Sequence, residues 1–487
     1  MPVFLSSLLG NLWSIFLIVL FFGGSIFVHE LGHFLAARRR GAKVDRFSIG
    51  FGPAIWSWHG KDGVEYRIAW LPLGGYVLLP QLADLGALEG GATSDNTRLA
   101  PVSYETKMIV FVAGAFFNIL FAFALATILW VAGQPTSEEF STTRIGYVSA
   151  TMALPDGTTV TSPAAEAGLK PGDTIRAIDG SKVSDWSDLL QTLVTSSGVT
   201  GDGRREAVFT IERDGKLIDL TVHPRLVTDE KVRKVGILAA YTPIIAQVPE
   251  KSYAAKLGLQ VGDQLKALDG APLLNLITLY DALQAKTPSD LRLTVQRADQ
   301  RIEIPIPADH PKESSGIFGA AFRTQTGLVH TNPFVLVWSQ VTMTFRTLIS
   351  LIQPHSDINV SKLTGPVGIG KIFWDASEAG IRYVVWIAIL VNVNLAVFNL
   401  LPLPILDGGQ MVFATVARVR GRPLSTNFIA ASQSIFALLL VSMIFYVTIF
   451  GDIRRWVRDA KADAQAKAAA AEVQKVVPPA APAPTKP

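Results

Sequence analysis

The segment His29–His33 reads His-Glu-Leu-Gly-His and lies inside an apolar run that extends from about Leu8 to Ala37. Residues four apart share one face of a helix, so both imidazoles can bind one Zn²⁺ while Glu30 can reach a metal-bound water. The run is long enough to cross a bilayer and lacks the charged start and cleavage site of a signal peptide. Polar side chains at that depth are costly and usually functional. The pattern therefore predicts a first membrane span, residues 8–37, that carries a metal-binding motif.

The composition separates membrane-spanning stretches from a polar middle region. Of the 487 residues, 49% are apolar and only 17% are charged, and the apolar residues concentrate near both ends of the chain. Three further apolar runs of spanning length bring the predicted number of membrane helices to four. These spans are predicted at residues 107–132, 382–409 and 428–450. We therefore expect an α-helical, multi-pass membrane protein.

The charges and the lack of cysteine exclude several classes of function. The formal net charge is +4 and no basic run is interleaved with aromatic residues, which argues against nucleic acid as a partner. The chain has no cysteine, which excludes disulfide bonds, thiolate metal ligands and cysteine nucleophiles. Any metal ion must therefore be held by histidine, aspartate or glutamate.

The arginines that flank the apolar runs predict the orientation in the membrane. Arg38, Arg39 and Arg40 follow the first span, and residues 418–422 add three more arginines after the third, which places both loops in the cytoplasm. The polar middle region then lies outside, on the periplasmic side of a bacterial inner membrane. Three arginines within 454–458 favour the opposite orientation for the last span, but the first helix usually dominates insertion.

Between the first two spans, residues 44–78 predict a β-hairpin. The stretches 47–58 and 64–71 are rich in aromatic and β-branched residues, and Lys61-Asp-Gly between them is typical of a turn. Such an apolar hairpin can enter the bilayer if other parts of the protein cover its backbone groups. It can equally be a small surface hairpin with tryptophans at the membrane interface. The residues alone leave these two alternatives open.

The polar middle region contains an internal repeat. Residues 162–173 align without a gap with residues 252–263, and an Asp-Gly pair follows each copy in the same register. A helical stretch and an alternating pattern come next in both copies, which predicts two similar α+β modules at 143–225 and 234–309. The repeated Gly-Leu-x-x-Gly-Asp turn resembles that of PDZ domains in bacterial proteases. PDZ domains bind peptides by adding a strand to an exposed sheet edge.

Two segments beyond the modules are less regular. The stretch 330–352 is apolar with helical spacing but includes Gln340, Thr342, Thr344 and Arg346, which predicts an interfacial or packed helix rather than a fifth span. Residues 459–487 are rich in alanine and then in proline, which is typical of a short helix followed by a flexible tail.

A catalytic zinc site needs a third protein ligand, and the third span offers a candidate. The segment from Asn399 to Gly409 reads Asn-Leu-Leu-Pro-Leu-Pro-Ile-Leu-Asp-Gly-Gly. Pro402 and Pro404 break the helix and free backbone groups that protein or water must satisfy. Asp407 follows at the end of the apolar run. Taken alone, Asp407 also fits an Asp-Gly turn that closes the span.

The combination of these features resembles the site-2 protease family of intramembrane zinc metalloproteases. The resemblance rests on H-E-x-x-H in the first span, N-x-x-P-x-x-x-L-D-G in a later span, and PDZ-like modules between them. It covers nearly the whole chain, from Leu8 to Phe450. It implies that His29, His33 and Asp407 bind Zn²⁺ and that Glu30 is the catalytic carboxylate. It also implies that the hairpin at 44–78 re-enters the membrane beside the substrate.

The resemblance extends to several shorter motifs. Gly114–Asn118 looks like the family's G-x-x-x-N motif, and Leu363–Gly368 looks like the loop that precedes its third span. By the same resemblance Asn118, Asn394 and Asn399 lie near the substrate backbone and position it. The alternative for all three is interhelical hydrogen bonding, for which membrane asparagines are well suited.

The expected reaction is hydrolysis of a peptide bond within or near a transmembrane segment. The implied substrate is a membrane protein with a single transmembrane segment, such as an anti-sigma factor or a remnant signal peptide, and the PDZ-like modules imply peptide ligands. Two other classes compete: a membrane-tethered PDZ scaffold with a structural metal site, and a metal transporter. Glu30 argues against the scaffold, since a structural site needs no base. Two modules and four spans argue against the transporter.

Overall fold

The computed structural model describes residues 11–82, 102–154, 157–227, 232–285, 290–310, 317–358 and 363–458, together with positions 100, 360, 460, 461 and 464. The chain folds into two compact units. We call Met1–Leu125 with Asn359–Pro487 the membrane unit, and Ala126–Ile358 the module unit. The predicted tail at 459–487 lies outside the described residues apart from three positions.

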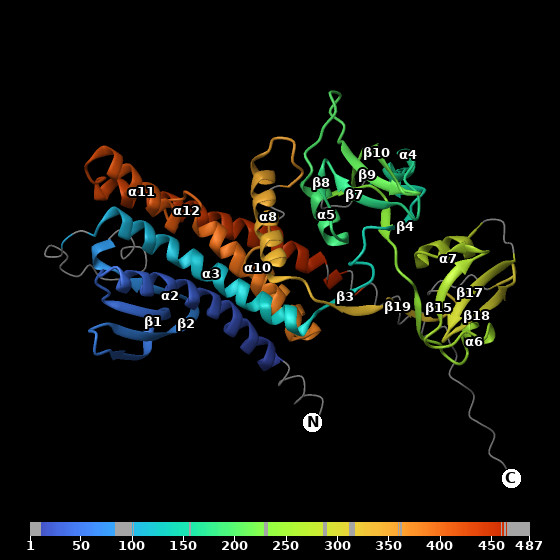
Figure 1. The fold of residues 1–487 in the computed structure, drawn as a ribbon, viewed down its shortest axis with the longest axis horizontal. Helices are drawn as coiled ribbons and strands as arrows, with labels where there is room; N and C mark the ends of the chain where they lie inside the picture. The colour runs from blue at the N-terminus through green and yellow to red at the C-terminus, as the bar shows by residue number, and fades with distance from the viewer. Residues whose placement is uncertain are drawn as a thin grey trace, which may run out of the picture. The chain divides into compact units, whose positions relative to one another are not determined.

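Helices dominate the membrane unit (Figure 1). The first described helix runs from Asn11 to Arg39 and contains a π-helical turn. The helices that begin in this unit are η1 (Val19–Gly23), α2 (Gly24–Arg39), η2 (Pro80–Leu82), α3 (Tyr104–Ala132), α9 (Pro366–Ala379), α10 (Ile381–Asn399), α11 (Asp407–Arg420), α12 (Thr426–Tyr446) and η5 (Val447–Ile453).

Five helices among the described residues are long and apolar enough to cross a membrane. Four of them overlap the spans predicted from the sequence. The fifth is α8 (Pro333–Ile352) of the module unit, for which the sequence predicts an interfacial position. The helix break predicted within the third span, 382–409, is present: α10 ends at Asn399 and α11 begins at Asp407. Proline lacks the N–H that a continuing helix needs, which explains the break at 402–404.

Close helix packing holds the first two spans together. A Cβ on Gly32 of α2 would lie 2.4 Å from the backbone oxygen of Ala113 in α3, so only glycine allows this approach. A similar contact occurs at Gly114 of α3, which faces α2 side chains directly. Small residues at such positions let membrane helices pack through their backbones.

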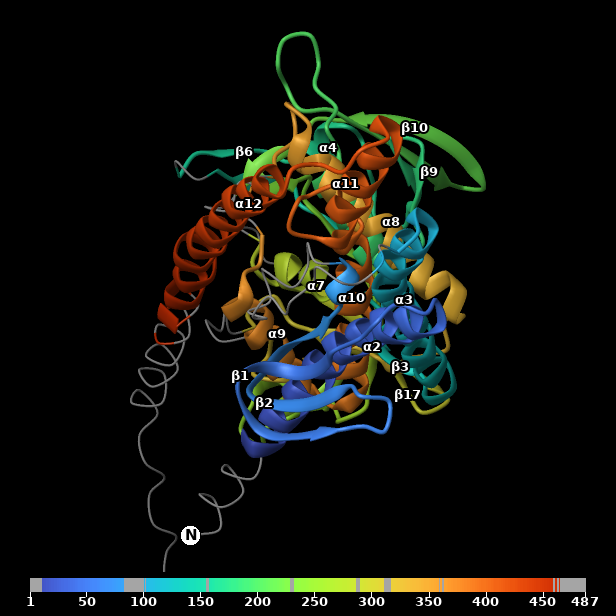
Figure 2. The same cartoon turned by 90° about the vertical axis from the view of Figure 1, so that its left-hand side faces the viewer.

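The predicted hairpin is present and packs along α2, as Figures 1 and 2 show. It consists of β1 (Arg46–His59) and β2 (Glu65–Leu78), both longer than the predicted strands. The first part of β1 pairs with both ends of β2, since Phe47 lies opposite Val77 on one side and Tyr66 on the other. Residues 46–49 therefore lie between the two ends of β2, and the hairpin curls so that four strand segments, 56–59, 65–68, 46–49 and 75–78, lie side by side.

Part of the hairpin exposes an apolar surface. Ile55, Trp56 and Trp70 are 58%, 61% and 71% exposed. By contrast, Phe47 and Val77 are buried in a core shared with α2 and α3. The hairpin thus buries some residues against α2 and α3 and exposes tryptophans elsewhere on its surface, which is a pattern typical of elements at a membrane interface.

The module unit contains two small α+β modules that correspond to the sequence repeat. The first includes β4 (Ile145–Val148), β5 (Thr151–Ala153), β6 (Thr159–Thr161), α4 (Pro163–Glu166), β7 (Thr174–Ile178), β8 (Ser181–Lys182), α5 (Trp186–Thr195), β9 (Ala207–Arg213), β10 (Lys216–Val222), β11 (Arg225–Val227), β12 (Val232–Lys234) and β13 (Ile237–Ala239). The second includes β14 (Ile244–Gln247), α6 (Tyr253–Lys256), β15 (Gln264–Leu268), β16 (Ala271–Pro272), α7 (Leu276–Leu283), β17 (Leu291–Arg297), β18 (Gln300–Ile306) and β19 (Ala321–Arg323). Each module has its own apolar core.

Equivalent residues of the repeat make the same helix caps and ion pairs in both modules. Ser162 and Ser252 cap α4 and α6 by accepting a backbone N–H three residues on. Asp173 and its counterpart Asp263 each accept two hydrogen bonds from an arginine of a neighbouring strand, all at 2.7 Å. These bidentate pairs, in which the carboxylate is buried, explain why the Gly-Asp turn recurs at the same spacing.

Each predicted module ends too early in the sequence, because its last strand lies beyond the predicted carboxyl end. Strand β13 (Ile237–Ala239) pairs with β4 of the first module, so this strand, which lies inside the predicted bounds of the second module, belongs to the first. In the same way β19 pairs with β14, beyond the predicted end at 309. Each module is closed by a strand that returns to its first strand.

Two further elements complete the module unit. A ribbon formed by β3 (Gln134–Ser137) and β20 (Thr326–Val329) brings the two ends of the modular region together. Helix α8 then runs with its polar side chains inward, because Gln340, Thr344 and Ser350 are buried while Trp338 is 71% exposed. A helix that buries polar residues and exposes apolar ones is typical of one that faces lipid.

Candidate metal centre

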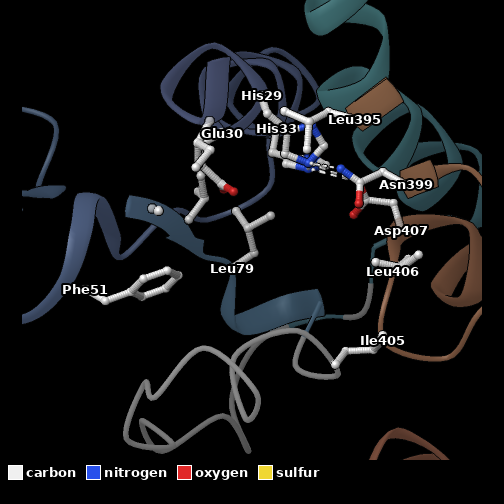
Figure 3. A pocket seen from close by; sticks show the side chains of 14 residues that line it. His29, Glu30, His33, Phe51, Leu79, Leu395, Asn399, Ile405, Leu406 and Asp407 are labelled. Carbon is white, nitrogen blue, oxygen red and sulfur yellow. Dashed lines mark hydrogen bonds and ion pairs between the residues drawn. The ribbon is translucent and has the colours of Figure 1, made fainter. Parts of the chain in front are cut away.

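Three side chains from two helices converge on one point in the membrane unit (Figure 3). His29 and His33 project from the same face of α2, and their Nε2 atoms lie 3.1 Å apart. Asp407, the first residue of α11, places Oδ2 3.3 Å from Nε2 of His29 and 3.4 Å from Nε2 of His33. All three residues are buried. The structure thus brings together the histidine pair and the aspartate that the sequence singles out.

The spacing of these atoms fits a zinc ion. Zinc held tetrahedrally at about 2.0–2.2 Å separates its ligand atoms by about 3.3–3.6 Å, within a few tenths of an ångström of the distances here. Oδ2 of Asp407 is buried without a conventional hydrogen bond, which is costly for a carboxylate unless a cation lies beside it. Two imidazole nitrogens and one carboxylate oxygen also form a donor set that zinc prefers.

Helix α3 packs against the two imidazoles on the side away from Asp407 and contacts both rings. The backbone oxygen of Val110 accepts a hydrogen bond from Nδ1 of His33 at 2.8 Å, which leaves Nε2 of that ring free to bind a metal. Gly114 lies one turn further, where a Cβ would approach Nε2 of His33 to 2.5 Å and Cε1 of His29 to 2.6 Å. Asn118, another turn on, lies beside His29. One stripe of α3 therefore supports both rings.

The broken segment between α10 and α11 positions Asp407. Gln410 donates to the backbone oxygen of Pro404 at 3.0 Å and so satisfies one of the groups freed by the prolines. A Cβ on Gly408 would lie 2.3 Å from the oxygen of Leu400, and one on Gly409 would lie 2.0 Å from that of Leu403. The two glycines after the aspartate are therefore needed to fold α11 tightly against the break.

A cavity of about 320 Å³ opens beside the three converging side chains. Glu30 lines it and makes no hydrogen bond or ion pair with any described residue. The hairpin contributes Phe51, Gly74 and Gly75 to the wall. A Cβ on Gly75 would lie 3.2 Å from Cγ of Glu30. The cavity therefore joins the site to the edge of strand β2, with an unpaired carboxylate between them.

The three asparagines predicted to position substrate lie in different surroundings. Asn399, the last residue of α10, lines the cavity, and its Nδ2 is 3.4 Å from Nε2 of His29. Asn118 is fully buried and Asn394 is half-buried, and neither is among the residues that line the cavity. Sequence reasoning missed Asn392, which is fully buried and donates to Ser25 of α2 at 2.8 Å. The sequence feature that could have indicated Asn392 is that it is a third asparagine in the same apolar helix as Asn394 and Asn399.

Sequence reasoning also missed Asp452 in η5. Its carboxylate accepts the backbone N–H groups of Gly365 and Gly368 at 3.1 and 2.8 Å, and Arg455 donates to it at 3.0 Å. The motif at Leu363–Gly368 thus forms the start of α9, capped by a buried aspartate from the last span. The sequence feature that could have indicated Asp452 is an acidic residue directly after the last apolar run.

Comparison with known proteins agrees with this geometry. Peptidase family M50 matches residues 16–443. The chain is 30% identical to the regulator of sigma-E protease of Escherichia coli K12 over 472 residues, which cover 92% of this chain and 100% of the relative. It is 30% identical over 477 residues to a putative zinc metalloprotease of Vibrio cholerae, covering 91% and 99%, and 29% identical over 474 residues to a regulator of sigma E protease of Salmonella typhi, covering 92% and 100%.

These matches run through both halves of the converging site and through the modular region between them. The resemblance to site-2 proteases inferred from the sequence is therefore confirmed. Together with the buried histidine and carboxylate cluster, they identify an intramembrane zinc metalloprotease that hydrolyses peptide bonds of membrane proteins: the chain belongs to Peptidase family M50.

Proposed function

We propose that His29, His33 and Asp407 are the zinc ligands of this protease and that Glu30 is its catalytic base. The observation that carries the proposal is the convergence of three buried ligand atoms beside a cavity lined by Glu30. Zinc bound here would polarise the scissile carbonyl and lower the pKa of a water from about 15.7 to about 7.

Glu30 would accept the proton of the attacking water and later deliver it to the leaving amine. Two features support this role. The side chain is next to the first ligand in the chain, and it extends into the cavity rather than into the helix packing (Figure 3). It also lacks a partner that would otherwise hold its carboxylate in place.

The substrate would bind as an extended strand along the hairpin. A peptide bond within a helix hides its carbonyl in hydrogen bonds, so the cleaved segment must unwind first. Strand β2 lines the cavity at Gly74 and Gly75. Strand addition to this edge would satisfy the substrate's backbone groups inside the membrane. Asn399 lies across the cavity and is placed to contact the same backbone.

We further propose that the protein lies in a bacterial inner membrane with its modules on the periplasmic side. The arginine-rich end of α2 supports this orientation. The apolar outer face of α8 supports an interfacial position for that helix, which keeps the number of spans at four. A reporter fused at Gly215, in the exposed β9–β10 turn, should report the periplasm. A cytoplasmic signal from that fusion would refute the orientation.

The substrate would be a membrane protein with a single transmembrane segment. The relatives named regulators of sigma-E protease suggest a regulatory protein such as an anti-sigma factor, and remnant signal peptides have the same single-span form. The two modules would act as PDZ-like domains that bind peptides or exclude substrates that still carry a folded outer domain. Each module ends in a strand, β13 or β19, at the edge of a sheet, as PDZ-type peptide binding requires.

Two substitutions test the assignment of roles. Asp407→Asn should weaken both zinc binding and peptidase activity, because a neutral amide is a poor zinc ligand. Glu30→Gln should abolish cleavage of a membrane peptide while zinc stays bound at one ion per chain. Zinc content by mass spectrometry and cleavage by gel assay distinguish the two. An Asp407→Asn protein with full zinc content, or an active Glu30→Gln protein, would overturn the proposal.

A further inference from the structure

Asn118 contacts the side of His29 that faces away from the converging ligand atoms. The asparagine is 0% exposed, and its side-chain amide lies 3.3 Å from Nδ1 of His29. Nε2 of the same ring points the other way, toward Asp407. Asn118 is therefore behind the site rather than in the cavity where a substrate would bind.

The chemistry of a zinc-bound imidazole defines what this contact must do. A histidine that binds metal through Nε2 uses the lone pair of that atom, so its proton is on Nδ1 and needs an acceptor. For His33 the acceptor is the backbone oxygen of Val110. For His29, Asn118 is the one described residue that bonds Nδ1.

The amide of Asn118 has an acceptor to offer. Its Oδ1 is buried and has no hydrogen-bond partner among the described residues, so it is not committed elsewhere. The oxygen and nitrogen of an amide exchange places by a half-turn of the side chain, and their assignment follows from the hydrogen bonds they make. With Oδ1 toward Nδ1, the amide accepts the proton that a zinc-bound His29 must carry.

We propose that Asn118 is a positioning residue of the metal centre: it accepts a hydrogen bond from Nδ1–H of His29 and so fixes the tautomer and the ring orientation that zinc binding requires. This inference rests on the proposed zinc ligands and departs from the substrate-positioning role that the family resemblance implies. It also explains the spacing of Gly114 and Asn118. The glycine makes room for both rings, and the asparagine, one turn later on the same face of α3, holds the nearer one.

The hydrogen bond between His29 and Asn118 can be tested by mutation, because its acceptor is a side chain. His33 is held by a backbone carbonyl, which no substitution removes, whereas His29 is held by a side chain. Asn118→Leu keeps the volume of the side chain and deletes the acceptor. Asn118→Asp keeps an acceptor at the same place. Partners of metal-bound histidines typically contribute about 10–100-fold to metal affinity.

Asn392 provides a matched control. It is the same residue type, is also 0% exposed, and bonds the same helix α2 one turn before His29, at Ser25. Asn392→Leu therefore removes an equally buried interhelical hydrogen bond without touching a proposed ligand. A loss of zinc that comes from loosened helix packing would appear in both leucine variants.

The test measures zinc affinity of the full chain in detergent by competition with a chromophoric chelator, and the absorption spectrum of the cobalt-substituted protein. Asn118→Leu should weaken zinc binding by about 10–100-fold and alter the cobalt spectrum. Asn118→Asp should stay within about threefold of the unmodified protein, as should Asn392→Leu. The proposal is wrong if Asn118→Leu binds zinc normally, if Asn392→Leu weakens binding equally, or if Asn118→Asp fails to restore it.

A fourth variant separates this inference from the proposed zinc site. His29→Ala should lose zinc outright if His29 is a ligand. Loss of zinc in His29→Ala with normal binding in Asn118→Leu would overturn the role of Asn118 alone. Normal zinc content in His29→Ala would overturn the ligand assignment itself. If Asn118→Leu only raises KM while zinc affinity and the cobalt spectrum are unchanged, Asn118 positions substrate, and the inference fails.

Discussion

Asp452 accepts the backbone N–H of Gly368 at 2.8 Å, although 84 residues separate the two along the chain. The same carboxylate accepts from Gly365, and it lies within the π-helical end of the last span. A Cβ on Gly365 or Gly368 would lie 2.7 or 2.6 Å from its oxygens. Aspartate and glycines therefore form a matched contact that ties the last span to the start of α9.

Removing this carboxylate should destabilise the membrane unit. Asp452→Ala removes the acceptor of two backbone N–H groups and one contact to Arg455, which should lower the free energy of unfolding by about 1–3 kcal/mol. Thermal unfolding in detergent measures the effect. Asp375→Ala is the control, since that carboxylate is 56% exposed and pairs with Lys371 on the surface of α9. Equal unfolding temperatures for the two variants would contradict the importance of the buried contact.

Gly114→Ala should remove zinc without unfolding the helices. The new Cβ would lie 2.5 Å from Nε2 of His33, so the ring must move, and zinc bonds tolerate only about 0.2 Å of change. We expect zinc affinity to fall at least about tenfold while circular dichroism stays unchanged. Gly370→Ala in α9 is the control, because nothing lies within 4 Å of its Cβ. A zinc-replete Gly114→Ala protein would show that the site has more room than the structure indicates.

Asp357 should make the module unit sensitive to acid. Burial alone would raise the pKa of its carboxyl, but hydrogen bonds from Arg205 and Arg233 outweigh burial and lower the pKa below its ordinary value near 3.8. A carboxyl with a depressed folded-state pKa contributes stability above its unfolded-state pKa, and that contribution is lost as the pH falls through the folded-state value. Unfolding of the intact protein should therefore become easier below about pH 4, and Asp357→Asn should flatten this dependence.

The same ion pairs predict a large effect at neutral pH. Arg233 is 0% exposed, so Asp357→Ala leaves a buried charge without its partner and should cost about 3–5 kcal/mol. Asp202→Ala is the control, because Asp202 pairs with Arg204 at the surface and its loss should change little. A stability loss no greater than that of the control would contradict the buried pair.

Excising the modules tests whether they filter substrates. The β3–β20 ribbon pairs Ser137 with Thr326, so residues 143–323 can be replaced by a short glycine-serine linker without separating the ribbon's strands. If the modules exclude uncut substrates, this variant should cleave a substrate that still carries its outer domain. The measurement compares cleavage of full-length and pre-trimmed substrates. A variant that is merely slower on both indicates docking instead of filtering.

Part of this site could be predicted from sequence because its residues are close together. His29, Glu30 and His33 occupy one helical turn, so local periodicity alone places both imidazoles on one face. Asp407 needed a second segment, but the prolines before it marked the helix break in advance. What periodicity could not predict was the surroundings of Asn118. Which face of α3 meets α2 depends on the close approach at Gly32, a packing contact between distant segments.

The module boundaries and the role of Asp452 also depend on contacts between distant segments, which sequence patterns do not predict. The repeat reveals the turns and helices of each module, but the closing strands pair with residues far back in the chain, as Ile237 does with Val148. A three-residue strand carries too weak a pattern to assign to one module or the next. Asp452 looks like the ordinary polar end of a span until the fold brings the start of α9 beside it.

Because Val110, Gly114 and Asn118 each contact one or both of the imidazoles, zinc binding depends on the register of α3 against α2. These residues span about 12 Å of α3, and a slip of one residue along α2 would move each contact by about 1.5 Å, far beyond what zinc bonds tolerate. Such a slip would also bring a side chain, in place of Gly114, against the rings. A chain whose second span is inserted out of register would then fail to retain zinc. Metal capture would thus act as an assembly checkpoint, so that an incompletely folded copy remains an inactive protease in the membrane.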